Sequence, residues 1–321
     1  MPYRTQPDAD KVLRPETPED FAALFDILEQ ELAADIAGDP ENVIRPLTLL
    51  AVRHLAGHTG LRCLLHGESG SGKTWAAKAL ARHLGAPYVR VSMPDTAETT
   101  WRGVDITNNI DAMRRGLLRP SISSDAATAL ANRAVVLVDD MDVMRLEPFQ
   151  SYGDSDKGQR AGRQSSLVNC WAGEDITIDE GAWVWSTRSV LVIGAGQFDG
   201  LEEPLDSSSL IRWGMIPPLA ERIAMGTIVH MPPLAAADLC AVATREALQL
   251  CAPAFSAFGY TLIISPEAVR RAVSVVRDSD SAAGVRAVAG LLRRVADRML
   301  IRLVSTAVPA GARVTLAPDD V

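Results

Sequence analysis

The feature that most constrains this chain is the octapeptide at residues 67–74, Gly-Glu-Ser-Gly-Ser-Gly-Lys-Thr, which completes the pattern G-x-x-x-x-G-K-[ST]. An apolar stretch, Leu61–His66, precedes it, and an alanine- and leucine-rich stretch, Trp75–Leu84, follows it. This order predicts a strand, a tight loop and a helix, the setting in which the motif binds phosphate. Glycines let the loop curl so that its N–H groups face phosphate oxygens, and the helix adds the positive end of its dipole. We expect a nucleotide site that includes Gly67, Glu68, Ser69, Gly70, Ser71, Gly72, Lys73, Thr74 and Trp75.

A second segment supplies the acids that such a site needs. Residues 134–140 read Ala-Val-Val-Leu-Val-Asp-Asp, an apolar strand that ends in two carboxylates. Lys73 is expected to reach the β- and γ-phosphates, while the Thr74 hydroxyl and Asp139 hold Mg²⁺. Asp140 is expected to polarise the attacking water as a general base. The alternative for this segment is an ordinary core strand with a solvated acidic end.

Short apolar runs alternate with helical stretches before a Pro-Pro pair at Pro232–Pro233. This alternation predicts an α/β fold with a parallel five-stranded sheet and helices on both faces. Beyond the pair the pattern is mostly helical. We predict an N-terminal lead-in and helix at 1–34, a nucleotide-binding domain at 35–232 and a small helical lid domain at 233–321. The five expected strands are Arg62–His66, Tyr88–Ser92, Ala134–Val138, Ser189–Ile193 and Thr227–His230.

Composition narrows the function classes. Apolar residues make up 47% of the 321 residues, which is ample for a core, and 32 basic against 40 acidic residues give a net charge of −8. This balance argues against a nucleic-acid-coating surface. No apolar run approaches the roughly 20 residues of a membrane span. Met1–Asp20 has no signal-peptide core, so we expect a cytoplasmic protein.

Several segments resemble the AAA+ ATPases, and specifically their ClpX/HslU unfoldase branch, over about Asp35–Leu316. Residues 35–39 (DIAGD) are similar to the family's adenine-gripping box. Residues 135–142 (VVLVDDMD) and 187–201 (TRSVLVIGAGQFDGL) are similar to two of its strand motifs. Residues 283–288 (AGVRAV) resemble its small-domain motif. The most specific segment is 210–223, LIRWGMIPPLAERI, which is very near the family's L-I-K-F-G-L-I-P-E-F-I-G-R-L.

The resemblance implies an AAA+ fold, ATP and Mg²⁺ as ligands, and roles for further residues. Ile36 and Ala37 would contact adenine. Arg222 matches the arginine finger that enters a neighbouring subunit's site, and Arg286 matches the arginine that reaches the phosphates from the lid domain. For each arginine the alternative is an ordinary surface charge on a helix. A finger acting between subunits implies a homo-oligomeric ring, expected to be a hexamer.

The resemblance also predicts loops that grip a protein. Trp101, Arg102 and Gly103 occupy the place of the family's aromatic pore loop, and an aromatic there can hold a polypeptide without reading its sequence. The alternative is a tryptophan packed on its own domain. Residues 151–163, rich in Gly, Ser and charge, are expected to form a mobile second pore loop. That loop carries Lys157, Arg160 and Arg163.

The chain departs from the family pattern at three places. Asp140 replaces the usual Glu, so its carboxylate is expected to sit about 1 Å farther from the water, a displacement that can cost about 100-fold in rate. No cysteine precedes Asp35, so the family's N-terminal zinc domain is expected to be missing. Only Glu202–Ser209 separates two motifs between which the family carries its peptidase-docking loop. We therefore expect no ClpP-type peptidase partner.

These observations leave more than one function open. The leading hypothesis is a ClpX-like ATPase that unfolds or remodels a protein partner, which a second protein is expected to recruit. The second is an ATP-dependent assembly or scaffold protein with weak hydrolysis. The third is a DNA-acting motor, disfavoured by the acidic balance. Trp183 and Trp185 alternate, so both point to one face of a strand, either inside a packed hairpin or as a docking patch for a partner.

Overall fold

The computed structural model describes residues 15, 17–37, 39–93, 106–146, 154–178, 181–201, 204–279, 284–306, 308–309 and 311–321. The chain divides into two compact units. One is formed by Met1–Gly67 with Lys73–Met231, and the other by Glu68–Gly72 with Pro232–Val321. Within the described ranges, no helix is long and apolar enough to cross a membrane.

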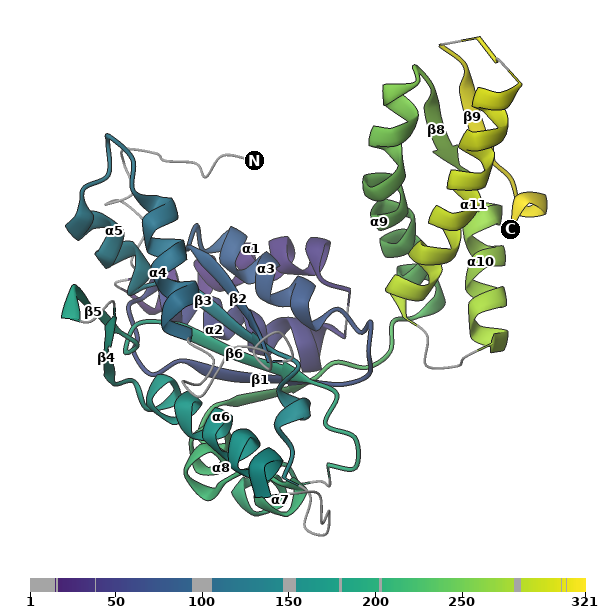
Figure 1. Ribbon diagram of the computed structural model, residues 1–321. Helices are drawn as coiled ribbons and strands as arrows, with labels where there is room; N and C mark the ends of the chain where they lie inside the picture. Colours follow the sequence, from purple (N-terminus) through teal and green to yellow (C-terminus); the bar gives the residue numbers. More distant parts are fainter. Residues whose placement is uncertain are drawn as a thin grey trace. The chain divides into compact units, whose positions relative to one another are not determined.

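The first unit is built on a five-stranded sheet in the order β2-β3-β6-β1-β7, in which every neighbouring pair is parallel. The predicted α/β fold is therefore confirmed, with helices on both sides of the sheet and a mainly helical C-terminal part (Figure 1). Sequence patterns placed β1, β2 and β7 at the observed residues and missed β3 and β6 by one to three residues. The strands are β1 Arg62–His66, β2 Tyr88–Ser92, β3 Val135–Asp139, β6 Leu191–Gly196 and β7 Thr227–His230.

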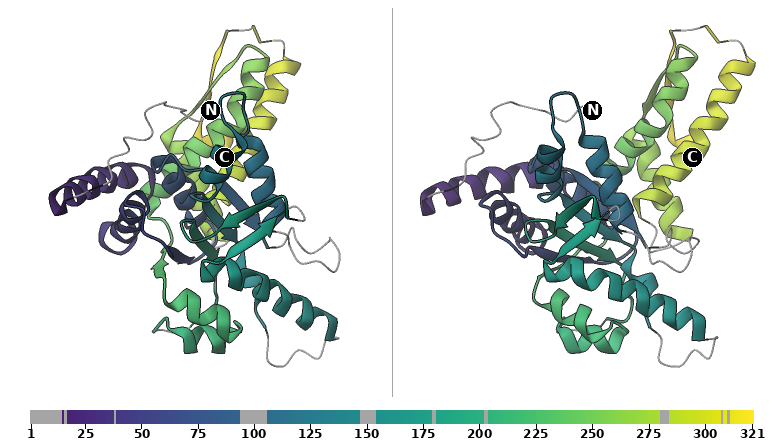
Figure 2. Two further views of the ribbon diagram at one scale, coloured as in Figure 1. Left: turned by 90° about the vertical axis from the view of Figure 1, so that its left-hand side faces the viewer. Right: turned by 60° about the vertical axis from the view of Figure 1, so that its left-hand side comes forward.

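The apolar residues of the strands pack into two cores, one on each face of the sheet, because side chains alternate across the sheet. In β3, Val135 and Leu137 belong to one core and Val136 and Val138 to the other. Helices α1 (Pro18–Asp35), α2 (Arg45–Leu55) and α3 (Lys73–His83) bury their apolar sides in the first of these cores. Figure 2 shows these purple and blue helices together on one side of the strands. The second core is covered by α4 (Ile106–Leu117), α5 (Ser124–Ala131), α6 (Asp154–Ala172), α7 (Ser207–Trp213) and α8 (Pro217–Ala224).

Helix α6 begins at Asp154, so residues 154–163 are helical and the mobile-loop prediction is wrong there. Tertiary contacts explain the difference. Arg160 Nη1 donates to the carbonyl of Arg145 at 3.0 Å. The buried Gln164 amide donates to Met144 and Gly214 carbonyls and accepts from the Ile216 N–H at 2.6 Å. These bonds fix a segment whose composition alone favours a loop.

A β-hairpin, β4 (Asp175–Ile178) with β5 (Trp183–Ser186), packs beside the sheet. Trp183 and Trp185 lie on one face of β5 as predicted, and both are buried. The Trp183 indole donates to Asp111 Oδ1 at 3.1 Å and the Trp185 indole to the Ala131 carbonyl at 3.2 Å. The packed-hairpin interpretation is confirmed, and the docking-patch interpretation is wrong.

The second unit has its own core, with a two-stranded parallel sheet between β8 and β9. Helix α9 continues past Leu250 and through Pro253 to Ala257. Burial of Cys251 and Phe255 on the same helix face explains this extension. The elements are α9 Ala236–Ala257, β8 Thr261–Ile264, α10 Pro266–Ser279, α11 Val285–Ser305, β9 Arg313–Leu316 and the 3-10 turn η6 Pro318–Asp320.

Candidate functional site

The phosphate-binding motif forms the predicted strand, loop and helix. β1 ends at His66 and α3 begins at Lys73, and Gly67, Gly70 and Gly72 between them have φ angles of +144°, +80° and +96°. Side-chain-bearing residues rarely adopt these angles. At Gly67 space is a second reason, because an added Cβ would lie 2.1 Å from the carbonyl oxygen of Met231. Only glycine therefore fits at position 67, the first residue of the loop.

The two polar residues that follow the loop lie at the start of α3. Lys73 Nζ donates to the carbonyl of Gly67 at 2.6 Å, so the lysine folds back over its own loop. Thr74 Oγ1 donates to Asp139 Oδ2 at 2.9 Å, which joins the helix to the tip of β3. The structure therefore brings together the two halves of the site that lie 65 residues apart in the sequence.

The donor set fits Mg²⁺. A hydroxyl oxygen and a carboxylate oxygen meet at the carboxyl edge of the sheet, and hard oxygen ligands are those that Mg²⁺ prefers. The Asp139 side chain is only 5% exposed. The adjacent phosphate cradle would bring the phosphate oxygens that usually complete such a site.

Asp140 lies beside this pair in an unusual backbone conformation, with φ 58° and ψ 41°. Aspartate tolerates this left-handed region better than most residues. Its Oδ2 accepts from Ser92 Oγ at 3.4 Å. Burial raises the pKa of the Asp140 carboxyl, and the charges of Asp139 and Asp142 raise it further, while Arg90 and Ser92 lower it in part. A carboxyl with a raised pKa is a better proton acceptor, in keeping with the predicted role.

Arg90 is a charged residue of the site that the sequence reasoning missed. It lies in the middle of β2, and its Nε donates to Asp139 Oδ2 at 2.8 Å. Its Nη2 lies 3.8 Å from Asp140 Oδ2. The available signal was a cation in the strand Tyr-Val-Arg-Val-Ser, because strands of parallel sheets are normally apolar throughout.

A histidine pair also borders the loop without having been predicted. The rings of His66, the last residue of β1, and His230, the last of β7, have centroids 4.8 Å apart. Burial lowers the pKa of His66 to about 4, with His230 and Lys73 as lesser causes. Among the described residues His66 Nε2 has no hydrogen-bond partner. The imidazole next to the phosphate loop is therefore neutral at pH 7.

The predicted adenine-contacting segment lies where α1 ends. Ile36 is buried and Ala37 is half-buried. The indole of Trp75 donates to the Asp35 carbonyl at 2.7 Å, which links this segment to the first turn of α3. Arg82 and His83 of α3 both pair with the Asp35 carboxylate. The acid that opens the motif thus anchors the segment beside the phosphate loop.

The remaining predicted residues are placed as follows. Arg222 lies in α8, half-buried, and its Nη1 donates to the Pro218 carbonyl at 2.7 Å. Arg286 is exposed in the first turn of α11 in the second unit. Their roles at a nucleotide stay predictions. Trp101, Arg102 and Gly103 lie outside the described residues.

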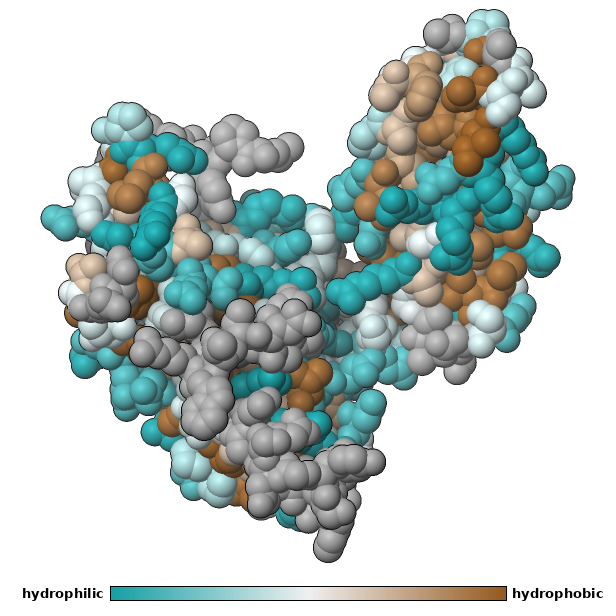
Figure 3. Space-filling view, in the orientation of Figure 1, coloured by the Kyte–Doolittle hydropathy of each residue, from teal (hydrophilic) through white to brown (hydrophobic). Residues whose placement is uncertain are grey.

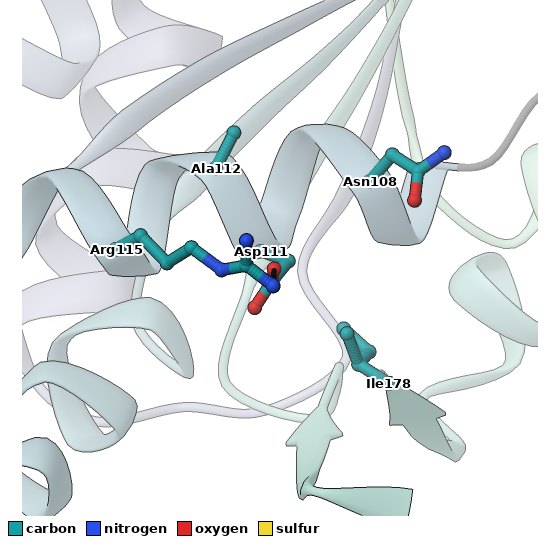
Figure 4. Close-up of a pocket in the computed structure, with 5 residues that line it drawn as sticks. All are labelled: Asn108, Asp111, Ala112, Arg115 and Ile178. Atoms are coloured by element: carbon teal, nitrogen blue, oxygen red, sulfur yellow. Dashed lines mark ion pairs between the residues drawn. The ribbon is translucent and has the colours of Figure 1, made fainter. Parts of the chain in front are cut away.

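Figure 4 shows a small pocket of about 250 Å³ between α4 and β4. Its lining includes an ion pair in which Arg115 Nη2 lies 2.6 Å from Asp111 Oδ2. Because Asp111 also accepts from Trp183, its buried carboxylate fastens the hairpin to α4. We interpret this cluster as structural. The lining residues are Asn108, Asp111, Ala112, Arg115 and Ile178.

Comparison with known proteins agrees with this geometry. Residues 63–212 match the ATPase family associated with various cellular activities (AAA). Over 160 residues the chain is 26% identical to the ATP-dependent Clp protease ATP-binding subunit ClpX 3 of Methylococcus capsulatus. That alignment covers 44% of this chain and 34% of the relative, so the chain spans about a third of the relative's length. The matches support an AAA+ ATPase that binds nucleotide.

Proposed function

We propose that this chain is a ClpX-like AAA+ ATPase that binds ATP with Mg²⁺ and uses its hydrolysis to unfold or remodel a protein partner. The observation that carries the proposal is the cluster at the carboxyl edge of the sheet. Lys73, Thr74 and Asp139 converge there beside a glycine cradle, with Asp140 next in the chain. In this proposal Lys73 binds the phosphates, Thr74 and Asp139 hold the metal, and Asp140 orients the attacking water.

We further propose that the protein works as a ring, expected to be a homohexamer. Arg222, on α8, would act as the arginine finger in the site of the next subunit, and Arg286 would act within its own subunit. Exposed apolar side chains support protein contacts, since Figure 3 shows apolar residues gathered over parts of the second unit. Large apolar residues of that unit that are at least two-fifths exposed are Leu250, Phe258, Ile263, Ile301 and Val304.

The partner in this proposal is a protein, and the remodelling is independent of a ClpP-type peptidase. The similar protein from Methylococcus capsulatus is an ATP-binding subunit of a Clp protease. Only eight residues, Glu202–Ser209, stand here between the two motifs that flank the family's peptidase-docking loop. A second protein would recruit the substrate, and Trp101 would grip it. The cytoplasmic location stays a prediction.

The test measures ATP turnover and oligomer mass together in the full chain. Asp140→Asn is expected to lower turnover about 100-fold, the range of a lost general base, while leaving ATP binding intact. Arg222→Ala is expected to lower turnover about 1,000-fold, as loss of an arginine finger does. Trp101→Ala should retain turnover and lose remodelling of an identified partner. Wild-type turnover that does not depend on Arg222 would contradict the shared-site ring.

One observation favours the assembly or scaffold alternative. The Asp140 carboxylate, shorter than the usual Glu, is 46% exposed, bonded to Ser92 and within 3.8 Å of Arg90. A base held in this way is displaced from an ideal position for water activation. The scaffold function predicts ATP-dependent oligomers with turnover near background in the wild type. The same experiment therefore separates the two functions.

A further inference from the structure

Arg90, the one cationic residue of the edge strand β2, faces Asp139 and Asp140 at the end of β3. β2 and β3 pair in parallel, with Arg90 opposite Leu137 and Ser92 opposite Asp139. Val89 and Val91 are buried in the core below, so Arg90 projects from the opposite face. This is the face on which α3 and Thr74 lie.

A single carboxylate oxygen is the meeting point of three groups. Asp139 Oδ2 accepts from Thr74 Oγ1 at 2.9 Å and from Arg90 Nε at 2.8 Å. It is also the oxygen that points at the threonine expected to hold the metal. The other oxygen, Oδ1, accepts from the backbone N–H of Asp140 at 3.2 Å. The guanidinium therefore bonds to the carboxylate oxygen that faces the proposed Mg²⁺ position.

Electrostatics makes Arg90 and a divalent cation rivals at this oxygen. A guanidinium keeps its charge at all accessible pH values. A metal that binds Asp139 either replaces the hydrogen bond from Arg90 or sits beside a resident positive charge. Both arrangements weaken metal binding. The same charge favours a nucleotide that carries no metal, because the phosphates then find a cation already in place.

We infer that Arg90 is a built-in counter-ion of the Asp139–Asp140 pair that competes with Mg²⁺ and makes nucleotide binding less dependent on the metal. The inference rests on the proposed nucleotide site and adds a positioning residue to it. The exposure of Arg90 fits this role. Its side chain is 40% exposed, whereas the structural Arg62 is buried at 4% with its donors on backbone carbonyls.

The experiment titrates the full chain with a fluorescent ATP analogue, first in EDTA and then at fixed nucleotide with increasing MgCl₂. In Arg90→Met the half-saturating Mg²⁺ concentration should fall about tenfold, and affinity in EDTA should weaken about tenfold, the size expected for one charge-assisted hydrogen bond. Arg90→Lys, which keeps the charge, should stay close to wild type. Arg270→Met, which removes a surface pair with Glu267 in the second unit, should change neither quantity.

The outcomes separate the inference from the function on which it rests. Failure of the wild type to bind nucleotide in any condition overturns both. Nucleotide binding with the same Mg²⁺ midpoint in wild type and Arg90→Met overturns only the inference. Circular dichroism checks the fold of each variant, and Arg90→Gln replaces Arg90→Met if the latter unfolds. An equal shift of the Mg²⁺ midpoint in Arg270→Met would also overturn the inference about Arg90, because the effect would then not be specific to Arg90.

Discussion

The two edges of the five-stranded sheet use buried charge in opposite ways. At the amino edge, the Arg62 guanidinium donates to the carbonyls of Leu61, Trp171, Thr187 and Val190 at 2.8–3.0 Å. Among the described residues no carboxylate forms an ion pair with it, and burial lowers its pKa. At the carboxyl edge, Arg90 faces Asp139 and Asp140, and the Asp140 backbone is left-handed. In the described part of the chain, Nε2 of the neighbouring His66 has no hydrogen-bond partner.

This difference shows how one fold separates stability from function. At the amino edge the buried guanidinium of Arg62 is bonded to backbone carbonyls, which ties β1, α6 and the segment after the hairpin together. The carboxyl edge instead brings together the charges of Arg90, Asp139 and Asp140 and a strained backbone at Asp140, which a ligand can stabilise. Ligands of open parallel α/β sheets generally bind beyond the carboxyl ends of the strands.

The largest expected effect comes from breaking the amino edge. Arg62→Met removes the guanidinium donors from four carbonyls, of which those of Leu61 and Thr187 still accept from backbone N–H groups. It should lower the free energy of unfolding by about 4 kcal/mol, which chemical denaturation can measure. Nucleotide affinity of the protein that stays folded should not change. The control is Arg298→Met, at an exposed position of α11. If Arg62→Met lost nucleotide affinity without losing stability, the assignment of the amino edge to stability alone would be wrong.

The reciprocal change breaks the carboxyl edge. Lys73→Ala should weaken ATP binding about 100-fold, because a charge-assisted contact to phosphate is lost, with little change in unfolding free energy. Isothermal titration calorimetry gives the affinity. Lys78→Ala, on the exposed side of the same helix, is the matched control and should bind ATP as the wild type does. Equal affinities in the two variants would remove Lys73 from the site.

Acid should act on the amino edge through His54. Its Nε2 donates to the Arg133 carbonyl at 3.1 Å, two residues before β3, and burial lowers its pKa from 6.5 to about 4. The neutral form therefore stabilises the fold above pH 6.5, and this stability is lost as the pH falls toward 4, by about 1.4 kcal/mol per pH unit. His54→Gln should have a shallower pH dependence of unfolding free energy by that amount.

The exposed His58 supplies the comparison for this effect, since His58→Gln should keep the wild-type slope. His66, whose pKa is also lowered, remains in both variants and contributes equally. Identical slopes for His54→Gln and the wild type would mean that His54 does not set the acid sensitivity of this edge.

The smallest expected effect concerns one hydrogen bond at the same edge. Asn132 Oδ1 accepts from the Ser186 N–H at 3.0 Å and holds the hairpin against the start of β3. Asn132→Ala should lower the free energy of unfolding by about 1 kcal/mol. Asn169→Ala, at an exposed position of α6, should not destabilise the protein. A larger loss in Asn169→Ala would show that side-chain truncation, and not this bond, is being measured.

Sequence reasoning located the sheet well because its signals are local. Apolar runs and turn residues can be recognised from neighbouring positions in the chain, so β1, β2 and β7 fall where the patterns place them. It failed where distant contacts override composition. Gln164 and Arg160 hold residues 154–163 in a helix through bonds to Met144, Arg145 and Gly214. The local sequence around residues 154–163 does not indicate that these carbonyl groups will be its hydrogen-bond partners.

The same distinction holds for the site. The motif at residues 67–74 and the Asp139–Asp140 pair are contiguous, and the structure brings Thr74 and Asp139 together as the sequence predicts. Arg90 and His66 were missed because their importance depends on strand register and on which sheet face each side chain takes. Parallel pairing sets Ser92 opposite Asp139, and only then does Arg90 meet the acids.

The close approach of Gly67 to Met231 has a mechanical consequence. The Met231 N–H donates to the His66 carbonyl at 2.7 Å, and its own carbonyl fills the space where a Gly67 side chain would stand. Met231 is also the last residue of the first unit. The backbone at the first glycine of the predicted phosphate loop and the backbone at the end of the first unit are therefore in direct contact, with no side chain between them. A shift of the backbone at Gly67 is therefore passed directly to Met231, the residue at which the first unit ends.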